Sequence, residues 1–334
     1  MKRNWLWLIG PWALFIALAG GWIAYWMIVA GEAERRLDAW VADQRAGGAS
    51  AEIGAVVRRG FPTLLRLELR NAAFAPARGG WRASTQHLDL HVNLLNTQHI
   101  SLQARSPIAF ARADGSTTEL RADALIASLR TSDGVLAQAG VEADNVTLDD
   151  PAREGVMRAD RVVLNVRPDP RADGEYQVAF DAQALTLPRP VRSFESFGVE
   201  VAAMRAAIVV SDGISLLQGA DGDPLGPWRD AGGELRFEAL VLNWGPLETT
   251  GTGRGRLDAE RRLQGELQFP IEEPARVFSA IASDPRVDED ARQALRLLAT
   301  AFQISGDDIT LDVEAREGML RLEGVRVREL PPVY

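Results

Sequence analysis

Apolar and polar side chains alternate with a period of two along most of the chain beyond residue 48. In residues 86–93, QHLDLHVN, Leu88, Leu90 and Val92 share one face of an extended strand, and polar side chains occupy the other. The same alternation recurs in residues 99–104, 145–149, 161–166, 176–187, 234–244, 263–269, 309–315 and 319–327. The pattern predicts half-buried strands, each with one apolar face.

Turn signals separate many of these strands. Asp-Gly pairs stand at 114–115, 133–134, 173–174 and 212–213, and such pairs favour the tight turns of hairpins. Consecutive strands joined by short turns pair antiparallel. We therefore expect a mainly β protein built on a large antiparallel, curved sheet, forming either a groove or a sandwich.

One helical insertion interrupts the strands, near residues 274–302. Its apolar side chains follow helical spacing, and the acids at 288–290 suit the positive end of a helix dipole. The side chains that carry this spacing are Val277, Phe278, Ile281, Ala291, Leu295, Leu298 and Phe302.

The N-terminal segment has a different pattern. Residues 5–30 contain no charged side chain, and this run is longer than the ~20 residues that a helix needs to cross a bilayer core. It is also too long for the apolar region of a cleaved signal peptide. We therefore expect residues 1–30 to form a transmembrane signal anchor, with headgroup-level aromatic side chains that include Trp5, Trp7, Trp22 and Trp26.

The long body that follows the apolar run favours a cytoplasmic N-terminus, because long domains are translocated largely regardless of their charge. Residues 31–48 predict a juxtamembrane helix that Gly47 and Gly48 end. Residues 49–334 predict a β-rich domain outside the cytoplasm. A Pro/Gly cluster at 219–228 is the best candidate for a boundary between two halves of this domain, and it fits a long surface loop equally well.

Composition removes several classes of function. The 334 residues carry a net charge of −9, and nucleic acid is therefore not an expected partner. The chain has no cysteine, which excludes disulfides, thiolate catalysis and cysteine-ligated metals. No cofactor is expected.

The stretch TTGTGRGRLD, residues 249–258, is the nearest approach to a phosphate-binding loop. A dinucleotide fingerprint has its third glycine one residue later and opens a helix, whereas here an alternating strand follows. Gly255 is not followed by Lys and Ser or Thr, which excludes a P-loop. Alternate glycines predict a strand with one face stripped of side chains, which permits strong twist or close approach by another element.

The remaining candidates for chemistry are weak. His87 and His91 share a strand face but have no recognisable third ligand, and His99 lies on the next strand, so we interpret all three as solvated polar positions and expect no metal site. Adjacent acids on a strand point to opposite faces and make poor acid-base pairs. We expect no catalytic residues and no enzyme activity.

Four stretches in this order resemble a known family: RRGFPTLLRLEL (58–69), LNWGPLETTGTGRGRLD (242–258), RLQGELQF (262–269) and MLRLEGVRVRELPPVY (319–334). With the N-terminal span, they resemble the bacterial family catalogued as domain of unknown function 2125. More distantly, the arrangement is similar to the AsmA-like envelope proteins, which are thought to shield or move lipids in an elongated β-groove. The resemblance implies a single-pass protein of the bacterial inner membrane with its main domain in the periplasm.

Two functions remain open. In the first, an apolar sheet face binds or shields phospholipid or another envelope lipid. In the second, the body is a non-enzymatic scaffold with a closed core that binds envelope proteins. Both use the bilayer as a partner through residues 5–30. The first predicts a groove lined by Leu88, Leu90, Val92, Ile100, Leu102, Val162, Leu164, Phe237 and Leu267.

Overall fold

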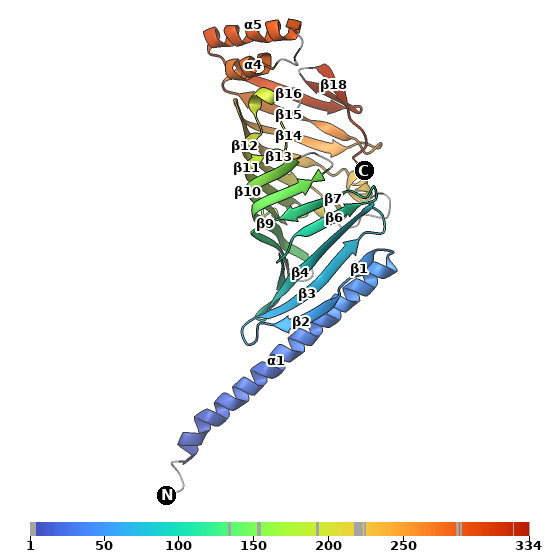
Figure 1. Ribbon diagram of the computed structural model, residues 1–334, viewed down its shortest axis with the longest axis vertical. Coiled ribbons are helices and arrows are strands. Elements are labelled where there is room, and N and C mark those ends of the chain that lie inside the picture. The colour runs from blue at the N-terminus through green and yellow to red at the C-terminus, as the bar shows by residue number, and fades with distance from the viewer. Residues whose placement is uncertain are drawn as a thin grey trace. The chain divides into compact units, whose positions relative to one another are not determined.

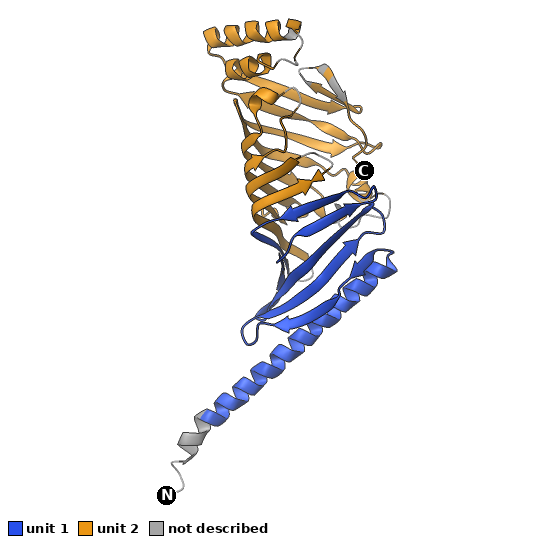
Figure 2. Cartoon of the chain, viewed as in Figure 1, with its two compact units in different colours: residues 1–133 blue, residues 134–334 orange. Residues whose placement is uncertain are grey.

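The structure is a computed structural model of the whole chain. It describes residues 5–132, 135–151, 155–191, 194–216, 223, 225–284, 287, 289–322 and 324–333. The chain divides into two compact units, residues 1–133 and residues 134–334 (Figure 2).

Unit 1 joins one long helix to an antiparallel sheet (Figure 1). Helix α1 (Trp5–Ala46) runs without a break through the residues that the sequence divides at position 30. The strands that follow it are β1 (Ser50–Glu52), β2 (Ala55–Arg59), β3 (Leu65–Ala75), β4 (Trp81–Asn93), β5 (Asn96–Ala104), β6 (Ile108–Arg112), β7 (Thr117–Arg121) and β8 (Ala124–Ser132).

The pairing in unit 1 is antiparallel throughout. Strand β3 pairs with β1, β2 and β4, so it lies in the middle of one half of the sheet. Strand β4 pairs with β6 along its first residues and with β5 along its last residues, and β5 continues to β8. The register places Leu65 opposite Val92 and Leu67 opposite Leu90, which gives this sheet one apolar face.

Helix α1 packs on that apolar face. Trp26 and Ala30 are buried in one cluster with Leu65, Leu67 and Leu69 of β3. Leu65 and Leu67 have no exposed side-chain surface. The helix therefore covers the part of β3 from Leu65 to Leu69, and it does so with residues that the sequence assigned to the membrane span.

Unit 2 is a succession of antiparallel strands with short helices between some of them (Figures 1 and 2). Each strand pairs with the next one along the chain from β9 to β18. The elements are β9 (Val135–Asp150), β10 (Gly155–Pro168), β11 (Tyr176–Thr186), η2 (Glu195–Phe197), β12 (Glu200–Val210), α2 (Gly213–Leu216), α3 (Gly226–Asp230), β13 (Leu235–Trp244), β14 (Leu247–Leu257), β15 (Leu263–Ile271), α4 (Pro274–Ala282), α5 (Glu289–Ser305), β16 (Ile309–Arg316), β17 (Met319–Leu322) and β18 (Val325–Glu329).

The glycine-rich stretch forms strand β14, as the sequence predicts. A Cβ at Gly251 would overlap the ring of Phe269, and a Cβ at Gly253 would overlap the carbonyl oxygen of Glu266 in β15. The missing side chains therefore let two neighbouring strands approach closely, which is the reason that this strand carries glycine at alternate positions.

The predicted helical insertion is also confirmed, as α4 and α5. Val277 of α4 is buried with Ile271 of β15 and Phe197 of η2. The rings of Phe278 and Phe302 lie 5.7 Å apart between the two helices. Helix α4 thus forms a small core at one end of the unit 2 sheet.

Two local expectations are wrong. The stretch 319–327 is a hairpin of two strands, β17 and β18, because Gly324 takes a left-handed conformation at φ 74° and reverses the chain. The Asp212-Gly213 pair does not close a hairpin, since α2 begins at Gly213. Asp114-Gly115 and Asp173-Gly174 lie in turns between paired strands, and the pair at 133–134 lies outside the described residues.

The Pro/Gly cluster at 219–228 falls within unit 2. Strands β12 and β13, which precede and follow this part of the chain, pair directly with each other. Residues 219–222 and 224 of the cluster lie outside the described residues, and residues 226–228 form the start of helix α3, in which Trp228 is buried.

A candidate apolar binding groove

An apolar groove of about 990 Å³ lies in unit 1 between α1 and the sheet. Its volume falls within the roughly 300–1,000 Å³ that is usual for ligand pockets. Five of the nine predicted lining residues line it: Leu88, Leu90, Val92, Ile100 and Leu102.

The strand register explains why these five side chains meet. Val92 of β4 pairs with Ile100 of β5, Leu90 pairs with Leu102, and side chains two residues apart on a strand share a face. Helix α1 covers β3 but leaves the β5 and β8 side of this face open, and Leu102 is accordingly 37% exposed. The groove exists because one helix is too narrow to cover the sheet.

The helix supplies the second wall, and the groove prediction from the sequence missed it. Tyr25, Val29, Ala33, Leu37 and Trp40 line the groove at helical spacing. The spacing of three or four residues places these side chains on one helical face, but periodicity alone does not say what that face contacts. Phe74 and Leu129 from the sheet also line the groove and were not predicted.

The lining of the groove includes polar as well as aromatic side chains. Glu32, Arg36 and Gln98 contribute polar groups to its lining. Hydrogen bonds from Arg36 and Arg35 lower the pKa of the Glu32 carboxyl, which keeps it charged at neutral pH. Among the aromatic lining residues, the ring of Phe74 lies 6.0 Å from that of Trp40. Aromatic contacts continue from Phe74 to Trp81 and on to Phe110.

The tryptophans assigned to the membrane surface take different positions. Trp22 is partly exposed and donates its indole N–H to the carbonyl oxygen of Pro62, at 2.7 Å. Trp26 is buried and donates to the carbonyl oxygen of Leu64, at 3.2 Å. It faces protein because Phe61 and the β3 leucines surround it. The side chains of Trp5 and Trp7 lie outside the described part of the chain.

The other four predicted lining residues lie in unit 2. Phe237 pairs with Gly253, and Gly253 pairs with Leu267, so these side chains share one face of the sheet. Val162 and Leu164 of β10 lie on one face of their strand, and both remain at least partly exposed. Their neighbours across β11 are Ala182 and Phe180, and this apolar face continues into β12.

Helix α4 covers the unit 2 apolar face only at the end formed by Ile271, Ile309 and Leu311. Large side chains elsewhere on the face stay partly exposed, among them Leu164 and Met204. Within unit 2, the apolar face is therefore not sealed as the interior of a closed sandwich would be.

The polar face of the unit 1 sheet holds the histidines. Asp89 is only 4% exposed, which differs from the solvated position that alternation predicts. It accepts a hydrogen bond from Arg105 at 2.9 Å and lies 3.8 Å from Arg66. Burial lowers the pKa of the His91 imidazole, and the Asp89 carboxylate opposes this shift. His87 and His99 are exposed.

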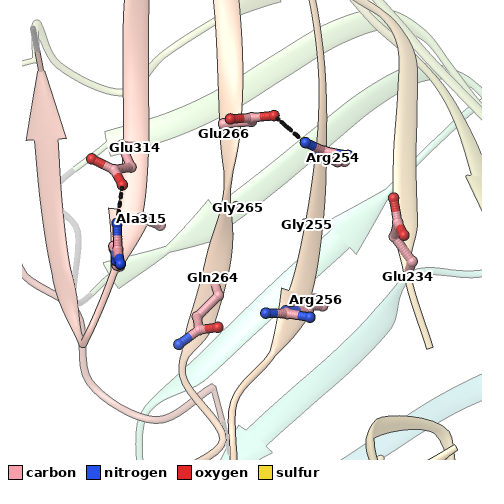
Figure 3. A pocket seen from close by; sticks show the side chains of 10 residues that line it. Glu234, Arg254, Gly255, Arg256, Gln264, Gly265, Glu266, Glu314 and Ala315 are labelled. Carbon is pink, nitrogen blue, oxygen red and sulfur yellow. Dashed lines mark hydrogen bonds and ion pairs between the residues drawn. The ribbon is translucent and has the colours of Figure 1, made fainter. Parts of the chain in front are cut away.

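A second hollow, of about 460 Å³, lies in unit 2 beside the glycines of β14 and β15 (Figure 3). Four of its charged side chains form two ion pairs: Arg254 with Glu266 at 2.8 Å, and Arg316 with Glu314 at 3.8 Å. The Arg254–Glu266 pair is largely exposed, and such pairs interact weakly. Among the described residues, no group of three or more His, Asp or Glu could hold a metal ion.

The fold and the groove define a protein in which an apolar N-terminal helix is followed by antiparallel β-strands that form two compact units. The described part of that helix is long and apolar enough to cross a membrane. The chain belongs to the family described as uncharacterized protein conserved in bacteria (DUF2125), whose model matches residues 26–331. No curated protein matches the chain.

Proposed function

We propose that the protein is a non-enzymatic, inner-membrane-anchored envelope protein that holds the apolar chain of a membrane lipid in the unit 1 groove. The observation that carries this proposal is a groove of about 990 Å³ whose wall begins on α1 at Tyr25 and Ile28, in the apolar run itself. Water in such a groove contacts apolar side chains, and its replacement by an acyl chain is favourable.

In this proposal, the N-terminus is cytoplasmic and both units are periplasmic. The apolar run of α1 and the long body that follows it support this orientation. Shielding or moving lipid is the role that the similarity to AsmA-like envelope proteins suggests, and the partly exposed apolar face of unit 2 provides a further surface of the same chemistry.

The test uses the full chain in bilayer nanodiscs that contain a phosphatidylethanolamine with a photoreactive diazirine on its acyl chain. After illumination, lipid adducts are mapped by mass spectrometry. Adducts at Phe74, Ala83 and Ile108, which line the end of the groove near the start of β4, would support the proposal. Adducts confined to the apolar run and the loops at the other end of β4 would overturn it.

The scaffold alternative is favoured by one observation. Helix α5 exposes Leu297 and Ile304, which are seven residues apart and therefore share a helix face. An exposed apolar stripe of this kind is typical of protein interaction sites. A photoreactive residue at position 297 that yields one discrete protein adduct in cells, while the groove yields no lipid adduct, would favour the scaffold.

A further inference from the structure

Two loops of unit 1 lie beside α1 where the apolar run meets the sheet. We call them the base loops: the β2–β3 corner, residues 60–64, and the β4–β5 turn, residues 94–95. Three side chains of α1 bind them through hydrogen bonds to carbonyl oxygens. Trp22 donates to Pro62 at 2.7 Å, Tyr25 to Leu94 at 2.7 Å and Trp26 to Leu64 at 3.2 Å.

The length of helix that a bilayer core requires indicates where Trp22, Tyr25 and Trp26 would lie in a membrane. A bilayer core of ~30 Å takes about 20 helical residues at 1.5 Å per residue. The apolar run begins at Trp5, directly after the charged Lys2 and Arg3 and the polar Asn4. A span of about 20 residues therefore ends near residue 24, between Trp22 and Tyr25. The hydrogen bonds hold the base loops at that same level.

The base loops expose large apolar side chains at this level. Leu95 is 87% exposed and Phe61 is 52% exposed, and Leu64 is exposed as well. The ring of Phe61 packs edge-on against Trp26, at a centroid distance of 5.7 Å, so its position is set by the helix. Single exposed leucines are common on protein surfaces. These three, however, lie on the two loops that α1 binds at the end of its span.

We infer that the base loops are a second membrane contact, in which Phe61, Leu64 and Leu95 enter the outer layer of the bilayer that α1 crosses. The contact seats unit 1 directly on the membrane instead of leaving it on a free stalk. The mouth of the groove at Tyr25 and Ile28 then faces the acyl chains. This inference rests on the proposed anchoring by α1, and it does not require that lipid occupy the groove.

The chain has no cysteine, so single cysteines report depth cleanly. An environment-sensitive fluorophore is attached to Phe61→Cys or Leu95→Cys in the full chain, in nanodiscs of phosphatidylethanolamine and phosphatidylglycerol. Lipids with nitroxide-labelled acyl chains serve as quenchers. Phe15→Cys marks the span. Thr117→Cys is the control exposed to water. Thr117 pairs with Ala111, Ala111 pairs with Arg82, and Arg82 lies roughly 35 Å along β4 from Asn93, the residue before the β4–β5 turn.

We expect shorter-wavelength emission and loss of fluorescence at positions 15, 61 and 95, and neither at 117. Quenching at 15 with unquenched labels at both 61 and 95 would overturn the base-loop contact and leave the anchoring intact. No quenching at 15 would overturn the anchoring and, with it, this inference. Neither result depends on lipid adducts inside the groove. A failure of the base-loop contact can therefore be distinguished from a failure of the proposed lipid binding in the groove.

Discussion

The hydroxyl of Tyr25 in α1 donates a hydrogen bond to the carbonyl oxygen of Leu94 in the β4–β5 turn, at 2.7 Å. Leu94 is itself buried in the cluster that joins α1 to the sheet, whereas Leu95 beside it is the most exposed of the large apolar side chains that the structure describes. This hydrogen bond ties α1 to a turn in which Leu94 is buried in the core and Leu95 is exposed.

The Tyr25 hydrogen bond is tested by Tyr25→Phe. We expect a loss of about 0.5–1.5 kcal/mol of stability, the usual net contribution of such a bond. Amide hydrogen exchange should become faster at residues 94–96 and stay unchanged in the β6–β7 turn at 113–116. If the substitution left the exchange rates of both turns unchanged, a role for Tyr25 in holding the β4–β5 turn would be contradicted.

Occupancy of the groove by lipid is tested with two substitutions that each introduce one carboxylate, one inside the groove and one outside it. Leu102 of β5 lines the groove. Ile126 belongs to β8, which pairs with β5, and its side chain lies on the opposite face of these two strands. Both residues are 37% exposed. Leu102→Glu places a carboxylate in an apolar space, where an unpaired charge is costly. We expect it to lower diazirine-lipid adducts at Phe74, Ala83 and Ile108 by roughly tenfold, equivalent to about 1.4 kcal/mol.

Ile126→Glu is the control for this measurement. It should leave the adducts unchanged, because its side chain is on the face away from the groove. If both variants lost adducts equally, a general effect on folding or membrane insertion would explain the loss. If neither did, the lipid chain would not pass Leu102.

The glycines of β14 offer a second matched pair. A Cβ at Gly253 would overlap the Glu266 carbonyl oxygen, whereas a Cβ at Gly255 would meet its nearest neighbours at an ordinary 3.5 Å. We expect Gly253→Ala to destabilise unit 2 by about 1–3 kcal/mol through overpacking. Gly255→Ala should change stability by no more than about 1 kcal/mol. Thermal unfolding followed by circular dichroism measures both, and equal effects would refute the close approach of β14 and β15.

His91 predicts a pH dependence of stability. Burial lowers its pKa in the folded state from 6.5, so below about pH 6.5 the unfolded chain takes up a proton that the folded chain does not. Stability should therefore fall as the pH drops below 6.5, by at most about 1.4 kcal/mol per pH unit. His91→Gln should flatten this part of the profile, measured by urea unfolding between pH 5 and pH 7.5.

The exposed His99 provides the comparison for that experiment. His99→Gln should leave the slope of stability against pH as it is in the unaltered chain. If His91→Gln also left the slope unchanged, other groups would be responsible for it.

The groove could be predicted only in part. Period two correctly placed Leu88, Leu90, Val92, Ile100 and Leu102 on one strand face, because alternation is a property of the extended backbone itself. The same reasoning placed Val162, Leu164, Phe237 and Leu267 with them. These four lie in unit 2, since period two says which face of its strand a residue occupies but not which other strands contribute to the same groove.

Asp89 illustrates the same limit on the polar face. Alternation places it opposite the leucines, which is correct, but its burial depends on Arg105 and Arg66, which other strands bring to it. Likewise, Trp26 has the sequence context of a membrane-surface tryptophan. It is buried because the β2–β3 corner places Phe61 and Leu64 against it.

The sequence by itself determined the long apolar helix, the alternating strands, the helical insertion near 274–302 and the glycine-rich strand, because each follows from local periodicity and the steric demands of single residues. Only the tertiary structure decided that the end of the apolar run in α1 packs on β3 and leaves the β5 side of the same face open. That outcome depends on which apolar surfaces meet, and the free energy of burial is nearly the same for any apolar partner of suitable shape.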